Sequence, residues 1–153
     1  MKSFSSLIIG IVIMTLIGCQ NNATNNLIEN PNEINEANTK VKDYVDNNTY
    51  IDVDVQALVK KTTAQDSRSN ITEDDNAKMK AAVYRFYKHV SVKDSLYILD
   101  IQDASEINIS TRVFTALAEN LKEMNDFIKL AKEKGENIDL FIPDEEYLNS
   151  LLQ

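Results

Sequence analysis

The chain of 153 residues contains one cysteine, Cys19, and one histidine, His89. A thiol acts as a nucleophile or a metal ligand in its thiolate form, which a neighbouring base, cation or metal must stabilise. The residues after Cys19 are Gln20, Asn21 and Asn22, and they supply none of these groups. A single cysteine also leaves the chain without an internal disulfide bond. Cys19 is therefore a candidate for chemical modification and not for catalysis.

The segment in front of Cys19 has the pattern of a secretory signal. Lys2 is followed by a mostly apolar run over residues 7–17, well short of the roughly 20 residues that span a bilayer. A basic start before an apolar run of this length is typical of a signal peptide. The run ends in Leu16-Ile17-Gly18-Cys19, which resembles the lipobox of bacterial lipoproteins: an aliphatic residue, any residue, a small residue and cysteine.

The lipobox resemblance implies that residues 1–18 are a lipoprotein signal peptide and that Cys19 is the lipidation site. Gly18 is small enough to let a signal peptidase approach the backbone, and the thiol of Cys19 accepts a diacylglycerol. Two or more acyl chains hold a protein stably on a membrane, whereas one binds it marginally. The membrane is thus the first expected partner. The alternative interpretation is a plain secretory signal with an incidental cysteine.

Residues 19–39 are predicted to form the acylated cysteine and a disordered tether. The stretch 20–39 is dominated by Asn, Glu and Thr, and it cannot bury enough apolar surface to offset the entropy of ordering. An alternative is that the first helix begins near Ile34. The remaining residues, 40–153, have a length expected for one domain.

The clearest helical signal covers residues 110–134. Apolar side chains from Phe114 to Ala131 recur at alternating intervals of three and four residues, which places them on one face of a helix. Ser110 is a good N-cap, and Gly135 stands where a left-handed C-terminal cap belongs. This segment is predicted to be one long amphipathic helix.

Four other segments complete the predicted elements. Residues 72–90 begin with a threonine cap and three acids, and their aromatic-rich stripe is expected in the core. Residues 54–63 and the tail 144–152 each have an acidic cap before an apolar face. Residues 92–101 suit either a helix or a buried strand, because periodicity cannot decide an apolar run this short.

The predicted fold is all-α, a small bundle of about five helices after the disordered tether. The part of the chain after Cys19 has one glycine and no Asn-Gly or Asp-Gly pair, which argues against tight hairpins. The same shortage excludes a P-loop and a dinucleotide-binding loop. The alternative is an α+β fold with a small sheet from residues 50–55, 96–101 and 138–142.

No residue pattern predicts a catalytic, cofactor or metal site. Asp52 and Asp54 are spaced like the start of an EF-hand loop, but the required glycine and glutamate are missing. His89 is expected at a helix end as a surface or cap residue, and Glu119 and Glu123 on a solvated face. The net charge of −8 makes nucleic acid a poor partner. We therefore expect no enzyme, with an unrecognised acid pair as the alternative.

The lipobox, the Asn-rich stretch and a small cysteine-free helical domain together resemble the outer-surface lipoproteins of Borrelia-type spirochaetes. The resemblance rests on residues 1–19 and the composition of 20–39, and only Cys19 carries over, as the acylation site. It implies a lipid-anchored, surface-exposed protein of the cell outer membrane that binds a host macromolecule in adhesion or immune evasion. One alternative is a periplasm-facing structural or accessory lipoprotein of the envelope. Another is a different Asn-rich bacterial lipoprotein lineage.

Overall fold

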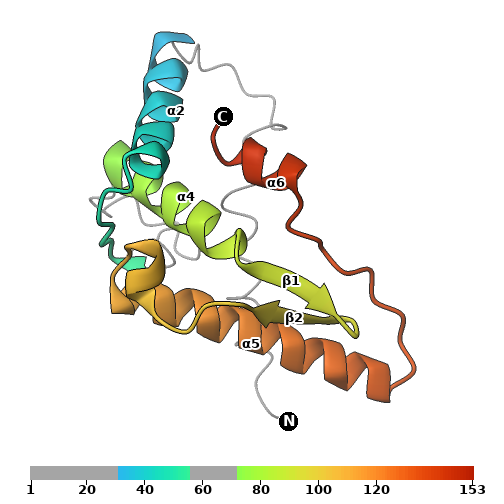
Figure 1. Ribbon diagram of the computed structural model, residues 1–153. Helices are drawn as coiled ribbons and strands as arrows, with labels where there is room; N and C mark the ends of the chain where they lie inside the picture. The colour runs from blue at the N-terminus through green and yellow to red at the C-terminus, as the bar shows by residue number, and fades with distance from the viewer. Residues whose placement is uncertain (1–30, 56–71) are drawn as a thin grey trace, which may run out of the picture.

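The computed structural model describes residues 31–55 and 72–153. The elements of this part are, in order, α2 (Pro31–Asp46), α4 (Glu73–Tyr87), β1 (Val90–Lys93), β2 (Leu96–Leu99), the 3-10 helix η1 (Ala104–Ile107), α5 (Thr111–Glu133) and α6 (Glu145–Ser150). Figure 1 shows α2 and α4 as a packed pair, with the β-hairpin leaving the end of α4 and α5 running along the hairpin. The described chain is therefore mostly helical with one small antiparallel sheet.

Helix α4 begins at the predicted cap. Thr72 Oγ1 accepts a hydrogen bond from the backbone N–H of Asp75 at 3.1 Å, and the Asp75 carboxylate accepts one from the Thr72 N–H at 3.0 Å. This reciprocal capping box satisfies donors that a helix start leaves open. The predicted aromatic stripe is core, since Phe86 is fully buried. The helix ends at Tyr87, earlier than predicted, because Val90 already belongs to β1.

Both predicted ends of the long helix α5 are confirmed. Ser110 Oγ accepts a hydrogen bond from the N–H of Val113 at 3.3 Å. At the other end, Gly135 has φ of +74°, and the next residue, Glu136, donates its N–H to the carbonyl of Ala131 at 3.0 Å. This bond pattern is a Schellman cap, and it favours glycine because other residues are strained at positive φ.

Residues 92–101 are the place where the structure departs from the all-helical prediction. Val90–Lys93 pairs antiparallel with Leu96–Leu99 through a two-residue turn at Asp94 and Ser95. These turn residues have φ of +54° and +59°, as in a type I′ turn, whose preferred residues are Asn-Gly and Asp-Gly. Aspartate enters the left-handed region more readily than most residues. The missing glycine therefore did not exclude a hairpin.

The alternative α+β prediction holds in part. Leu96–Leu99 is a strand, but its partner is β1, and residues 138–142 lie in no strand. Ile51 forms only an isolated parallel bridge with Ile109. The bridge brings the chain before Asp54 beside the chain before α5, with Ser110 donating its N–H to the carbonyl of Ile51 at 2.7 Å.

The first described helix begins inside the stretch that the sequence assigned to the tether. Residues 31–39 belong to α2, so the alternative of an early helix start is closer to the structure. Pro31 suits the first helical position, where its missing N–H costs no hydrogen bond. Val41 anchors the helix in the core at 1% exposure. Residues 1–30, and 56–63 of the predicted helix 54–63, lie outside the described part of the chain.

The core lies where α4 crosses α5. Small residues on α4 let the two helices approach, and the ring of Phe86 meets that of Phe114 edge-on, with centroids 5.8 Å apart. Ile51 and Ile109, the bridged pair, close this core from the side at 0% and 2% exposure. On α4, four side chains are fully buried in this core: Ala81, Ala82, Val83 and Phe86.

Candidate functional site

The predicted lipidation site, Cys19, lies outside the residues that the structure describes, so its modification stays a prediction. The sole histidine, His89, lies in the turn between α4 and β1, where it is half-buried and its carbonyl accepts the N–H of Asp100 at 3.0 Å. Over residues 31–55 and 72–153, no group of three or more histidine, cysteine, aspartate or glutamate side chains could hold a metal ion.

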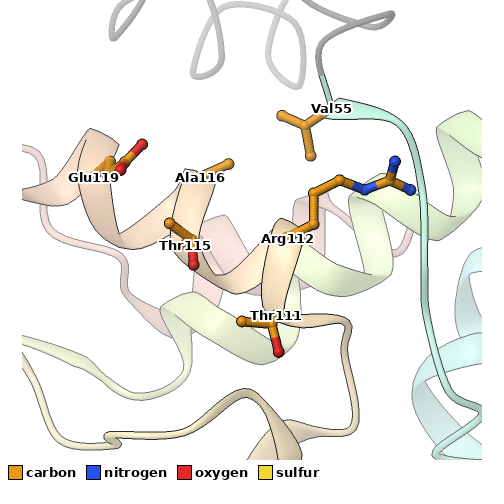
Figure 2. A pocket seen from close by; sticks show the side chains of 6 residues that line it. All are labelled: Val55, Thr111, Arg112, Thr115, Ala116 and Glu119. Carbon is orange, nitrogen blue, oxygen red and sulfur yellow. The ribbon is translucent and has the colours of Figure 1, made fainter.

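A shallow hollow lies against the first turns of α5 (Figure 2) and has a volume of about 270 Å³. Val55 faces α5 across it, and the helix contributes Thr111, Arg112, Thr115, Ala116 and Glu119. The lining thus brings one of the predicted solvated acids, Glu119, beside two hydroxyls and one cation. Among the described residues, its lining contains no histidine, cysteine or lysine that could activate a nucleophile. The described lining therefore offers a mixed apolar and polar surface for contact.

The cation of the hollow is already paired. Arg112 Nη2 donates to Asp52 Oδ1 at 3.0 Å, which ties the first turn of α5 to the chain that follows Ile51. The hydroxyl of Ser110 and then the guanidinium of Arg112 hydrogen-bond this carboxylate and lower the pKa of Asp52. Asp52 therefore serves to fix the start of α5, and it does not meet Asp54 in a shared ion site.

The most heavily bonded polar side chain of the described structure is Arg85, on α4. It is 7% exposed, and its Nη1 donates to the carbonyls of Thr49, Ile107 and Asn108 at 2.9, 3.2 and 3.2 Å. Its Nη2 donates to the carbonyl of Tyr44 near the end of α2. One guanidinium thereby joins α2, α4 and η1, using the several donors that arginine presents in a plane.

Sequence reasoning missed this role of Arg85. Burial lowers its pKa, yet an arginine stays charged under ordinary conditions. In the described part of the chain no carboxylate pairs with it, so backbone carbonyls alone stabilise the charge. The one signal in the sequence was an arginine between two aromatic residues, Tyr84 and Phe86, near the end of an amphipathic helix. A cation at this position is usually interpreted as a favourable interaction with the helix dipole, which hides the buried role.

A second polar contact joins α2 to α4. The Tyr44 hydroxyl donates to Asp74 Oδ1 at 2.6 Å, and Lys78 Nζ lies 2.7 Å from Asp74 Oδ2. The bonds from Lys78 and then from Tyr44 lower the pKa of Asp74, while the bond to Asp74 raises the pKa of Lys78. Both groups are thus held in their charged forms. This arrangement stabilises the helix pair and does not poise either group for proton transfer.

Asn120, on α5, is one of two residues in the described part of the chain with buried polar side-chain atoms that lack a hydrogen-bond partner; the other is Tyr147. Asn120 is 4% exposed, and neither Oδ1 nor Nδ2 has a hydrogen-bond partner. Leaving an amide unpaired in the interior costs free energy, so most buried polar groups have partners. Asn120 does not line the hollow of Figure 2, although Ala116, one helical turn earlier, does. The two features therefore do not combine into one site.

Comparisons with known proteins gave no relative: no family model, no curated protein and no solved structure matches the chain. Within the described ranges, no helix has the length and apolar character needed to cross a bilayer.

Proposed function

We propose that the protein is a lipid-anchored outer-surface protein whose domain binds a host macromolecule, with no catalytic activity, cofactor or metal. One observation carries the anchor: Leu16-Ile17-Gly18-Cys19 directly follows a short apolar run with a basic start. In this proposal the acyl chains on Cys19 hold the protein in the cell outer membrane, and the domain faces outward.

The position of α2 supports a domain held close to the membrane. Helix α2 begins at Pro31, so residues 20–30 separate it from Cys19. A stretch of this length reaches at most about 40 Å when fully extended. The anchor and the domain are thus joined by a short connection, as expected if the membrane is the place of action.

The exposed apolar side chains support a binding role. Phe127 and Leu130 are 41% and 49% exposed, and their spacing of three residues makes them neighbours on the surface of α5. Aromatic and aliphatic groups of this kind form the centres of many protein interfaces. Phe127 and Leu130 are therefore the first residues at which to seek a partner contact.

The anchor is tested by replacing Cys19 and following metabolic palmitate label and membrane fractionation. Cys19→Ala is expected to remove the label and release the protein from the membrane fraction, because the thiol that accepts the lipid is gone. Gly18→Ala is the matched control, since it keeps a small residue at the cleavage site and is expected to retain the label. A labelled, membrane-bound Cys19→Ala variant would refute the proposal.

The outward orientation is tested by adding protease to intact cells. The domain is expected to be cut under conditions that also cut a known surface protein and spare a periplasmic marker. Protection of the domain in such cells would contradict surface exposure and favour the periplasm-facing accessory role. Binding of envelope proteins during purification would then be the next measurement.

A further inference from the structure

We propose that residues 136–153 form a strap that opens as one unit while α2, α4 and α5 stay folded, and that the closed strap covers an aromatic surface formed by Tyr87 and Tyr97. The strap consists of the extended chain after α5, helix α6 and the last residues (Figure 1). This inference rests on contacts within the domain and is independent of the proposed lipid anchor.

The strap is separated from the body at a defined point. The Schellman cap at Gly135 ends α5, and residues 136–144 then contain no helix or strand. Helix α6 has six residues, which is too short to be stable on its own in water. The Asp144 cap, whose Oδ1 accepts the N–H of Tyr147 at 2.9 Å, is a bond within the strap. It therefore shapes the strap without holding it to the body.

Few polar contacts hold the strap to the body. Beyond the cap bond of Glu136, two hydrogen bonds do so across the described residues: Tyr97 donates its hydroxyl to the carbonyl of Phe141 at 2.8 Å, and Lys80 Nζ donates to the carbonyl of Gln153 at 3.3 Å. No ion pair in that part of the chain links strap and body. The strap has five acidic residues and no lysine or arginine, on a chain that is itself acidic.

The apolar contacts of the strap come from Leu151 in the core and from partly buried side chains that pack against it: Ile138, Leu140, Tyr147, Leu148 and Leu152. Leu151 is 1% exposed in the core, and the Tyr147 ring stands edge-on to Tyr87 and Phe141, with centroids 6.2 and 4.6 Å away. The hydroxyl of Tyr147 is buried without a hydrogen-bond partner, and burial raises its pKa to about 12. The closed position thus includes an unfavourable buried polar group that opening would return to water.

The body is held far more densely than the strap. Arg85 alone donates to four backbone carbonyls, and α4 and α5 share the fully buried side chains of the core. Regions with few buried contacts open locally at a lower free energy than the global unfolding. The difference in contacts therefore predicts that the strap detaches first.

Opening would expose a surface that the closed domain hides. Tyr87 is 2% exposed and Tyr97 5%, and strap residues contact the ring of the first and the hydroxyl of the second. Both side chains combine an apolar ring with a hydroxyl, a composition suited to contact surfaces. The strap thus works as a cover over Tyr87 and Tyr97.

The absence of tryptophan from the sequence allows a direct test in the full chain. One variant, Tyr147→Trp, places a fluorophore in the strap, and a second variant, Phe114→Trp, places one against the core of the body. During urea titration, the fluorescence of the strap variant is expected to change at a lower urea concentration than the fluorescence of the body variant. It is also expected to change before the helical circular dichroism signal of both variants. Coincident fluorescence transitions in the two variants would overturn the proposal.

Hydrogen exchange provides a second test without a fluorophore. In the unsubstituted full chain, amides of 145–150 are expected to exchange at least about tenfold faster than those in the middle of α4. Tyr147→Phe removes the unpaired hydroxyl and is expected to slow strap exchange about tenfold while leaving α4 unchanged. Equal protection of strap and α4 amides in the unsubstituted chain would refute independent opening.

Discussion

The side-chain amide of Asn125 binds both backbone polar groups of Tyr97. Its Oδ1 accepts the Tyr97 N–H at 2.8 Å, and its Nδ2 donates to the Tyr97 carbonyl at 2.8 Å. Tyr97 lies opposite Val92 in the hairpin, at a non-hydrogen-bonded pair whose N–H and C=O point away from the partner strand. Asn125 on α5 thus takes the place of a third strand and closes the outer edge of β2 at this residue.

Removing that amide is expected to weaken the hairpin. Asn125→Leu should lower the free energy of unfolding by about 1–3 kcal/mol, because it leaves two backbone groups of a buried strand residue unpaired. Urea denaturation followed by circular dichroism measures this change. An unchanged midpoint would mean that water replaces the amide without loss.

The second asparagine of α5 is expected to respond with the opposite sign. Asn120 is buried with both amide atoms unpaired, so Asn120→Leu should raise the free energy of unfolding by about 1 kcal/mol or more. The two substitutions are chemically identical and lie on one helix, which makes each the control of the other. Destabilisation by Asn120→Leu would show that the Asn120 amide has a favourable role in the folded protein.

Loss of Arg85 is expected to be the most damaging single change in the described domain. Arg85→Met keeps most of the apolar stem but leaves the carbonyls that Arg85 binds without their donor, so a loss of about 3 kcal/mol or more is expected. Arg112→Lys is the control, since the exposed pair with Asp52 should contribute below about 1 kcal/mol. Similar thermal midpoints for the two variants would contradict the central role of Arg85.

The hairpin turn contains a strained residue that glycine would relieve. Ser95 has φ of +59°, so Ser95→Gly is expected to stabilise the protein by about 0.5–1 kcal/mol. Ser91→Gly, in the neighbouring strand, should instead destabilise it by about 0.5–1 kcal/mol because glycine loses more entropy there. Chemical denaturation of both variants checks the pair of signs. A loss of stability in Ser95→Gly would argue against the type I′ turn.

Stability is expected to fall in acid partly through Asp74. The bonds from Lys78 and Tyr44 lower its pKa below the ordinary 3.8, so the folded protein binds this proton more weakly than the unfolded chain does. The stabilisation is therefore complete above pH 3.8 and is lost as the pH falls through the lower folded value. Asp74→Asn should flatten the pH dependence of the unfolding free energy below about pH 4.

An exposed carboxylate provides the control for this pH dependence. Asp139 has no hydrogen-bond or ion-pair partner among the described residues, so Asp139→Asn should leave the acid slope as it is in the unsubstituted chain. Unfolding midpoints measured between about pH 2 and 6 compare the two variants. Equal slopes for both would show that the Tyr44–Asp74–Lys78 contact does not link folding to protonation.

Local signals in the sequence predicted the starts of α4, α5 and α6 and the end of α5. Thr72, Ser110, Asp144 and Gly135 all cap the helix that their position indicated. A cap depends on hydrogen bonds between residues that lie three to five positions apart, so the information is contained in a short stretch of sequence. The same holds for the apolar face of α5, whose period follows from helix geometry alone.

The candidate sites were predicted less well because they depend on distant contacts. The lipobox is a linear motif, so Cys19 could be proposed from four neighbouring residues. Arg85 could not be assigned in this way, since the carbonyls it binds come from residues 22 to 41 positions away. No local pattern distinguishes such an arginine from one that merely ends a helix in water.

The sequence by itself determined the mostly helical character, the N-terminal caps of α4, α5 and α6, the C-terminal cap of α5, and the anchor hypothesis, since each arises from neighbouring residues. Tertiary structure alone decided that residues 90–99 form a hairpin. Their short apolar run suits a helix or a strand equally, and the choice depends on partners such as Asn125, which lies 28 residues beyond Tyr97. Pairing with a distant side chain overrides local preference because it satisfies backbone groups that the local sequence cannot.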